Sequence, residues 1–370
     1  MLPDTQGTDL QGTDTLMFDR NDGLTEAQKR IAQEWTCFDE DLDGTDPAIA
    51  AQVLRHRTNF AHNDLPRYAF KRDIPDDVVL YRDIPYMDGG PSAKGAGREH
   101  LLDVLLPRDA VVRGGAPIPV ILEIHGGAFF YGFKEINRAH AIVLAQHGYA
   151  VASVSYSLYP AVDFLAQLRE LAEATRWIRE EGSRYLLDAD QAFITADSAG
   201  AVQGLHLLAA MNNEDYADLI DVHPAKLGVL ALGFKSTMLD LDRLFDPDAR
   251  DAGGLVEELA PFFARYADTV RGSGFERLDD VLRAAGMPPT WTATSTDDFL
   301  EATSLELGAR LRDLDVDHQV LDYRAGSREC LPHNFIVGMP WLEESRDAVG
   351  SMIGFFTDHL TPRTGLIASE

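Results

Sequence analysis

The chain has 370 residues, of which 45% are hydrophobic and 25% charged, so it is long and apolar enough to bury a sizeable core. Its formal net charge is −27, because 60 Asp and Glu outnumber 33 Lys and Arg, and this excess argues against nucleic acid and anionic membrane surfaces as partners. Neutral or cationic small molecules are favoured, although an acidic surface that only aids solubility explains the same charge.

The first segment, residues 1–20, is polar, repeats Gln-Gly-Thr-Asp and predicts a disordered tail. It has no basic or apolar segment typical of a signal peptide, and no run in the chain reaches the roughly 18 apolar residues of a membrane span. We therefore expect a cytoplasmic protein with no membrane partner. Two cysteines, Cys37 and Cys330, are too few for a disulfide framework, and both are expected to be reduced.

Residues 21–77 predict an N-terminal helical cap segment that covers the sheet. Helices are expected over 25–35 and from Pro47 to about residue 57, with Asp46 capping the second. The acidic residues 39–44 between them imitate the first half of a calcium-binding loop, but Ala50 stands where such a loop has its bidentate glutamate. An acidic turn between helices is therefore favoured over a calcium site.

From about residue 78 short strands alternate with helices. Strands are expected over 78–86, 100–106, 119–124, 150–156, 192–196, 227–233, 290–294 and 318–323, and helices over 137–146, 164–181, 199–211, 299–311 and 343–359. The first two strands suit an antiparallel pair at a sheet edge. The other strands are short and apolar, so the alternation predicts the α/β class: a mostly parallel eight-stranded sheet with helices on both faces.

One interval interrupts this alternation. Residues 235–287 contain helix-like runs at 254–266 and 275–285 but no strand, and they predict an inserted helical cap. The catalytic domain is accordingly expected to comprise residues 78–234 and 288–370.

Ser198 stands where a predicted strand meets a predicted helix, in the sequence Ala196-Asp197-Ser198-Ala199-Gly200. Such a turn lifts a serine above the sheet, while the helix N-terminus directs amides and a positive dipole toward developing negative charge. The five-residue match is weak by itself, because a serine that merely caps a helix has the same surroundings in sequence. Other motifs in the chain therefore have to decide whether Ser198 is a nucleophile or a helix cap.

These motifs are the loop His125-Gly126-Gly127-Ala128, which ends an earlier predicted strand, and a late histidine. Glycines let a backbone turn its N–H groups toward a carbonyl oxygen, as an oxyanion hole requires. Among the 11 histidines, His333 alone follows the last predicted strand in a loop before the last helix, where a general base reaches Ser198. An oxyanion loop, a nucleophile and a histidine in this order are typical of a serine hydrolase on an α/β sheet.

The acid of such a site follows the penultimate strand, where Asp297 and Asp298 both stand. We choose Asp298 as the group that orients His333, and we expect its neighbour to cap the helix that begins at Phe299. Cys330 lies three residues before His333, but nothing near it in sequence is built to lower its pKa, so a spectator role is favoured over a nucleophile.

With these pieces in place, the chain resembles the hormone-sensitive-lipase-like carboxylesterases of the α/β-hydrolase superfamily over about residues 78–360. The resemblance rests on His125-Gly126-Gly127-Ala128-Phe129, Tyr156-x-Leu158-x-Pro160 with Phe164-Leu165-Ala166-Gln167, Asp197-Ser198-Ala199-Gly200, Pro288-Pro289-Thr290 and His333-x-Phe335. It implies oxyanion donors at the backbone amides of Gly127, Ala128 and Ala199, with Gly126 shaping the loop. Alanine replaces the family's third loop glycine at 128 and the first elbow glycine at 196.

The sequence thus predicts a serine carboxylic ester hydrolase in which Ser198 forms an acyl-enzyme, His333 transfers the proton and Asp298 orients His333. Phe129, Phe130 and Tyr131 follow the oxyanion loop and are expected to bind short-chain or aromatic acyl groups of a small neutral ester. No cofactor and no metal are expected. Two alternatives stay open: an amidase- or arylformamidase-type acyl hydrolase on the same residues, and a non-catalytic binding protein that uses the hydrolase pocket. A homodimer that pairs through the sheet edge is a further open interpretation.

Overall fold

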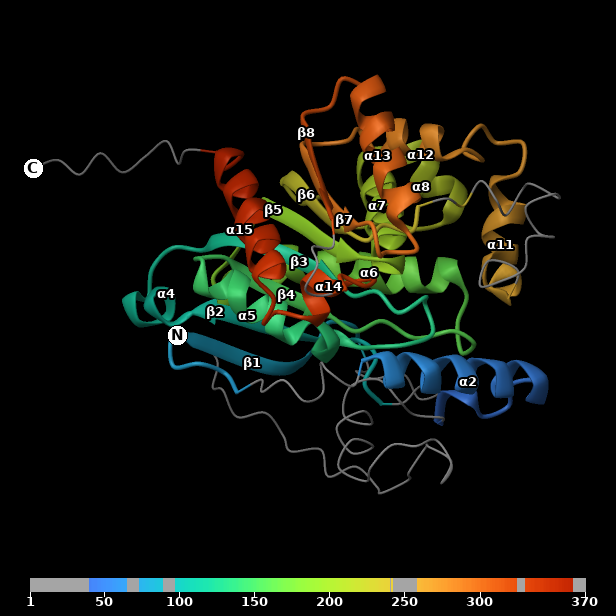
Figure 1. Ribbon diagram of the computed structural model, residues 1–370, viewed down its shortest axis with the longest axis horizontal. Coiled ribbons are helices and arrows are strands. Elements are labelled where there is room, and N and C mark those ends of the chain that lie inside the picture. The colour runs from blue at the N-terminus through green and yellow to red at the C-terminus, as the bar shows by residue number, and fades with distance from the viewer. Residues whose placement is uncertain are drawn as a thin grey trace, which may run out of the picture.

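The computed structural model describes residues 40–64, 73–88, 97–239, 241, 258–324 and 330–361. Its centre is a single eight-stranded sheet in the order β1-β2-β4-β3-β5-β6-β7-β8 (Figure 1). The strands are Val78–Pro85 (β1), Leu101–Pro107 (β2), Ile118–Ile124 (β3), Ala150–Val154 (β4), Leu187–Asp197 (β5), Val229–Lys235 (β6), Thr290–Ser295 (β7) and His318–Tyr323 (β8). Strand β2 pairs antiparallel with β1 and β4, and all other neighbours are parallel. The predicted fold class and the antiparallel edge pair are confirmed.

Helices cover both faces of this sheet. The longer ones are Pro47–Asn63 (α2), Arg138–Gln146 (α5), Phe164–Glu180 (α6), Ala199–Asn212 (α7), Ala260–Val270 (α11), Leu278–Ala285 (α12), Glu301–Asp313 (α13) and Glu343–Asp358 (α15). Helices α5 and α15 pack on one face, with α15 in front of the sheet in Figure 1, and α6, α7 and α13 pack on the other. The side chains of strand β3 alternate between the two faces of the sheet. Ile121 lies in the core under α5 and α15, and its neighbours Val120 and Leu122 lie in the opposite core.

Shorter elements connect these pieces. They are Arg108–Arg113 (α4), Glu214–Ile220 (α8), Phe335–Gly338 (α14) and the 3-10 turns Glu40–Leu42 (η1), Lys134–Asn137 (η2) and Gly182–Tyr185 (η3). None of these was expected from the sequence, because a helix of one or two turns shows no hydrophobic period. Strand β6 runs through Lys235, so this residue belongs to the sheet although the expected cap begins with it.

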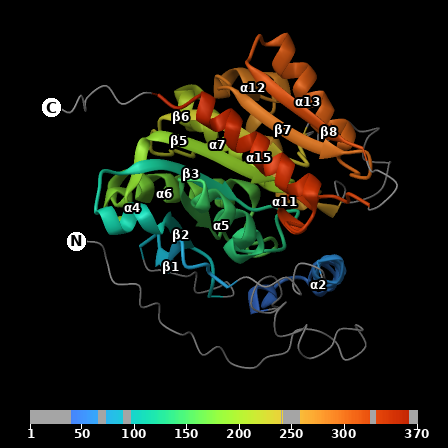
Figure 2. The same ribbon diagram turned by 60° about the vertical axis from the view of Figure 1, so that its left-hand side comes forward.

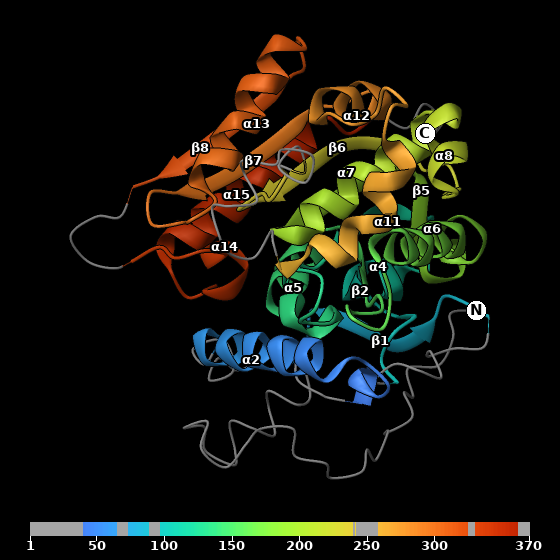
Figure 3. The same ribbon diagram turned by 90° about the vertical axis from the view of Figure 1, so that its right-hand side faces the viewer.

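The two expected cap segments are described in part. Helix α11 packs on α6 and α8, and α12 packs on α7, so both lie on other helices rather than on the sheet. Helix α2 lies outside the two helical layers (Figures 2 and 3). Asp46 caps α2 as expected, accepting from the amide of Ala48 at 2.8 Å, but the helix continues six residues past the expected end to Asn63. The tail 1–20, the helix 25–35 and Cys37 lie outside the described residues, and the division into domains stays a prediction.

Residues 40–44 of the calcium-like segment form a turn that begins with η1, and the expectation that the segment binds no calcium stays a prediction. Asp41 makes a buried ion pair with Arg57 of α2, which takes its carboxylate away from any cation. Across the described ranges, no group of three His, Cys, Asp or Glu side chains is arranged to hold a metal ion. In the same ranges, no helix combines the length and the hydropathy that a bilayer span requires.

Candidate active site

Ser198 occupies the turn between β5 and α7. Its backbone has φ 51° and ψ −122°, a conformation that non-glycine residues rarely adopt and that tight functional turns store as strain. A hydrogen bond holds the turn against the end of β6, because the amide of Ser198 donates to the carbonyl of Lys235 at 3.0 Å. The first turn of α7 also lies close to the end of β3, because a Cβ at Gly200 would lie 2.5 Å from the carbonyl oxygen of Ile124. This close approach of α7 to the end of β3 explains why position 200 is glycine.

Three side chains from three loops meet at this turn. His333 Nε2 lies 3.0 Å from Ser198 Oγ, and His333 Nδ1 lies 2.8 Å from Asp298 Oδ1. Burial alone would raise the pKa of Asp298, but hydrogen bonds from His333, Ser236 and the amide at 300, together with the charge of His333, hold it below its ordinary value. Asp298 is thus kept ionised and buried beside the imidazole, and this arrangement orients a general base.

The neighbouring aspartate has a different task. Asp297 Oδ2 accepts from the amide of Leu331 at 2.9 Å, so it holds the loop that carries His333. The expectation that Asp297 caps the next helix is wrong, because it is Asp298 that accepts from the amide of Leu300, at 2.9 Å. One carboxylate oxygen has two lone pairs, so Asp298 Oδ1 can take both the imidazole and this amide.

The loop after β3 has the geometry of a donor cradle. Gly127 has φ 110°, and a Cβ there would lie 1.9 Å from the carbonyl oxygen of Tyr131, so only glycine fits. A Cβ at Gly126 would lie 3.0 Å from Ser198 Cβ, which shows how closely this loop approaches the serine. Among the described residues, no acceptor takes the amides of Gly127, Ala128 or Ala199. These three amides are therefore available to a developing oxyanion.

Ala128 has φ 50°, so an alanine adopts the left-handed conformation in which the resembled family has glycine. A methyl group at this φ costs about 1 kcal/mol relative to glycine.

Phe129, Phe130 and Tyr131 are buried. The ring of Phe129 packs on Phe262 and Phe263 of α11, with centroids 4.9 and 5.2 Å away. The other two face α2: the rings of Phe130 and Tyr131 both contact Phe60, and the Tyr131 hydroxyl donates to Asp64 at 2.9 Å. The three aromatic residues attach α2 and α11 to the oxyanion loop, and their expected role in binding an acyl group stays a prediction.

Asp197, next to the serine, is a positioning residue that the sequence reasoning missed. Its Oδ1 accepts from Asn137 Nδ2 at 2.6 Å, and its Oδ2 accepts from Asn334 Nδ2 at 2.8 Å. Asn334 directly follows His333 and has φ 59°. Asparagine is one of the few non-glycine residues that tolerate this conformation, and its place after His333 was the signal available in the sequence.

A buried group of ionisable side chains also lies beneath the turn and was not anticipated. Lys235 Nζ donates to Thr195 Oγ1 on β5, and His140 Nδ1 lies 2.5 Å from Glu123 Oε1. Burial raises the pKa of Glu123 to about 8 although Lys235 opposes the shift, and burial lowers the pKa of Lys235 and of His140. These groups are packed under the site, and among the described residues the hydrogen bond of Ser198 Oγ is made to His333 and not to any of them.

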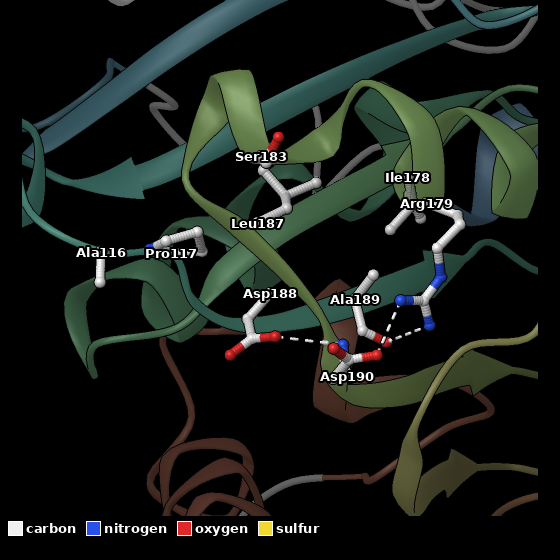
Figure 4. Close-up of a pocket in the computed structure, with 9 residues that line it drawn as sticks. All are labelled: Ala116, Pro117, Ile178, Arg179, Ser183, Leu187, Asp188, Ala189 and Asp190. Atoms are coloured by element: carbon white, nitrogen blue, oxygen red, sulfur yellow. Dashed lines mark hydrogen bonds and ion pairs between the residues drawn. The ribbon is translucent and has the colours of Figure 1, made fainter. Parts of the chain in front are cut away.

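Two other candidate features lie apart from the three meeting side chains. Slight burial, together with the charge and hydrogen bond of Asp297, raises the pKa of the exposed Cys330 thiol, so this cysteine is not activated as a nucleophile. A cavity of about 390 Å³ lies at the beginning of β5, beside residues 187–190 (Figure 4). Ser198 follows the other end of that strand. The one basic side chain of the cavity, Arg179, is already paired with Asp190.

Comparisons with known proteins point to esterases. Residues 102–226 match the BD-FAE family model. Two Mycobacterium tuberculosis proteins are similar: esterase LipQ, 33% identical over 36% of this chain and 30% of its own length, and esterase LipI, 34% identical over 47% of this chain and 62% of its own. The chain therefore spans less than two thirds of either relative.

Solved structures share the fold. Esterase B from Lactobacillus rhamnosus has a TM-score of 0.70 and 24% identity, covering 84% of this chain and 95% of its own. A bacterial heroin esterase has a TM-score of 0.57 and 20% identity, covering 86% of this chain and 98% of its own. The chain has the α/β-hydrolase fold of these esterases, and its match to BD-FAE over residues 102–226 is consistent with the resemblance to the hormone-sensitive-lipase-like carboxylesterases.

Proposed function

We propose that the protein is a serine carboxylic ester hydrolase that works through Ser198, His333 and Asp298. The observation that carries the proposal is the pair of hydrogen-bond distances around His333, 3.0 Å to Ser198 Oγ and 2.8 Å to Asp298 Oδ1. A nucleophile in reach of a base that is itself oriented by a third group is the arrangement required for acyl transfer. The similarity to named esterases supports the same reaction class.

The reaction begins when Ser198 Oγ attacks the ester carbonyl carbon as His333 Nε2 takes the hydroxyl proton. The carbonyl oxygen becomes an oxyanion, which the amides of residues 127, 128 and 199 stabilise. His333 then passes the proton to the alkoxy oxygen, the C–O bond breaks and the alcohol leaves an acyl-enzyme. Water, deprotonated by His333, attacks this ester and releases the carboxylic acid and the free serine.

Short-chain or aromatic acyl groups are the proposed substrates on the acid side. Support comes from the aromatic residues 129–131 next to the oxyanion loop, whose rings also hold α2 and α11 against it. One structure of the Lactobacillus esterase B carries a tributyrin phosphonate inhibitor, a compound built on short acyl chains. Esters with small acyl groups are therefore the first substrates to test.

Replacement of the nucleophile tests the reaction. The Ser198→Ala variant is expected to lose more than 99% of p-nitrophenyl acetate hydrolysis, because removal of a triad member leaves only the binding and oxyanion contributions. A fluorophosphonate probe should label the wild-type protein at Ser198 and leave the variant unlabelled. Cys330→Ala is the matched control, since its exposed thiol has a raised pKa, and this variant should keep full activity.

The two rival functions are separated by the same reagents. An amidase or arylformamidase would turn over anilides or formanilides faster than esters that carry the same acyl group. A binding protein without turnover would resist the fluorophosphonate probe, although the short contact between His333 and Ser198 favours a reactive serine. Full ester turnover by Ser198→Ala would disprove the proposed mechanism.

A further inference from the structure

Phe299 is the exposed aromatic residue of the candidate site. It follows Asp298 directly and is 73% exposed, one of three large apolar residues that are exposed in the described part of the chain. Its ring centroid lies 4.4 Å from that of His333, with the planes tilted by 41°. An exposed phenylalanine alone needs no explanation, but this one contacts the proposed general base.

The position of this ring is set by the backbone around it. The amide of Asp298 donates to the carbonyl of Ser295 at 3.0 Å, and the amide of Leu300 donates to Asp298 Oδ1 at 2.9 Å. Both neighbours of Phe299 in the chain are therefore held by hydrogen bonds, and one of them also binds His333. The ring is therefore exposed beside the imidazole, on a stretch of backbone that hydrogen bonds hold in place.

The chemistry of the proposed reaction determines what passes this ring. To receive its proton, the alkoxy oxygen of the ester must come within about 3 Å of His333 Nε2. The carbonyl oxygen, in contrast, is directed toward the amides of residues 127, 128 and 199. The group bonded to the alkoxy oxygen thus leaves along the imidazole, which is the side chain that Phe299 contacts.

We propose that Phe299 is a specificity-determining residue that binds the alcohol part of the ester and favours aromatic alcohols. The inference rests on the proposed esterase function and goes beyond it by naming the alcohol class. An aromatic alcohol covers an apolar ring that water otherwise contacts, and two aromatic rings gain an attraction beyond area burial. A small alkyl alcohol such as ethanol leaves most of the ring in water.

Benzyl acetate and ethyl acetate are the substrates that test this proposal. Both release simple alcohols of similar intrinsic reactivity, and kcat/KM for an acyl-enzyme reaction reports the steps through alcohol release. The wild-type ratio of kcat/KM, benzyl over ethyl, should fall by about threefold to tenfold in Phe299→Ala, the range typical of an aromatic pair. Phe299→Tyr keeps the ring and should keep the ratio.

Two controls separate alcohol binding from a general disturbance. Val112 on α4 is 77% exposed and precedes the amino end of β3, so Val112→Ala removes exposed apolar surface away from His333 and should leave the ratio unchanged. The ratio of kcat/KM between ethyl acetate and ethyl butyrate reports the acyl side and should not change in Phe299→Ala. Equal thermal melting temperatures verify that each variant is folded.

The proposal is overturned if the benzyl-to-ethyl ratio of Phe299→Ala stays within twofold of wild type, or if the acyl ratio changes by the same factor. Either result leaves the esterase function intact, because the wild-type protein still hydrolyses the esters. Failure of the wild-type protein to hydrolyse any ester, without fluorophosphonate labelling of Ser198, rejects the proposed function and this inference together.

Discussion

At the scale of single residues, Asp197 connects the segment that carries the nucleophile to the segment that carries the base. It lies directly before Ser198, and its carboxylate accepts from Asn334, which lies directly after His333, at 2.8 Å. Its second oxygen accepts from Asn137 at 2.6 Å, so the carboxylate is satisfied on both sides while buried. We infer that this bridge fixes the distance between Ser198 Oγ and His333 Nε2, since an error of about 1 Å in such a distance costs up to a hundredfold in rate.

Asn334→Gly tests the bridge with the least change to the backbone. Glycine adopts φ 59° without strain, so the variant removes the hydrogen bond to Asp197 and little else. We expect kcat for ester hydrolysis to fall about tenfold with KM within twofold of wild type, because the bridge acts on the base and not on substrate binding. A raised KM at unchanged kcat would contradict this positioning role. Asn334→Ala, which retains a Cβ at the same φ, should in addition melt at a lower temperature.

At the scale of elements, a buried guanidinium on helix α2 is a further link to the chain that follows the oxyanion loop. Arg57 Nη1 and Nη2 donate to the two oxygens of Asp41 at 2.7 and 2.5 Å, and Arg57 Nε donates to the carbonyl of Phe130 at 2.7 Å. Arg57 is fully buried. The side chain therefore connects α2, the acidic turn before it and the chain that follows the oxyanion loop.

Arg57→Met should lower the free energy of unfolding by about 3–5 kcal/mol, because it leaves the carboxylate of Asp41 buried without its partner. Urea denaturation of the purified protein measures this change. The double variant Arg57→Met with Asp41→Leu removes both charges and should recover more than half of the loss. If the double variant is as unstable as the single one, the unpaired charge of Asp41 is not the cause of the lower free energy of unfolding.

The elements of the sheet were predictable because their signals are local. Strands such as β3 and β4 are short and mostly apolar, with Glu123 and Ser153 as their polar residues, and both were expected within two residues of their ends. Helix α4 was not expected, because its six residues are half charged and begin directly at the end of β2. Such a short helix is stabilised by packing on β1 and β2, which local sequence does not display.

The site was predictable only where order along the chain carries information. Ser198, Asp298 and His333 follow the carboxyl ends of β5, β7 and β8, so their meeting follows from topology once the strands are placed. The second role of Asp298 at the amide of Leu300, and the bridge from Asp197 to Asn334, depend on side-chain directions in loops. No periodicity in the sequence encodes these directions, and the burial of Phe129 against α11 likewise depends on a long-range contact.

At the scale of the whole molecule, three histidines among the described residues are buried, His125, His140 and His206, and burial lowers the pKa of each of them. The pKa of His206 falls to about 3. In the unfolded chain these imidazoles regain a pKa near 6.5, so the unfolded state binds the protons first as the pH falls. Their contribution to stability is present above pH 6.5 and is lost as the pH falls through the lowered folded-state pKa of each imidazole, which for His206 is about 3. Glu123, whose pKa is raised to about 8, acts in the opposite sense, since its contribution is lost as the pH rises from about 4.5 to 8.

His206→Phe isolates one of these groups from the others. His206 is buried on α7, where its ring packs on Phe164 and its Nδ1 contacts the Tyr216 hydroxyl, so the variant is made together with Tyr216→Phe to remove both partners of this contact. Urea denaturation between pH 4 and 6 should show a free energy of unfolding that falls less steeply with acid than in wild type, by up to about 1.4 kcal/mol per pH unit. Tyr216→Phe alone retains the imidazole and should keep the wild-type slope. The effect of Glu123 is common to all three proteins and cancels in the comparison, so equal slopes in the double variant and wild type would show that His206 takes up its proton in the folded state.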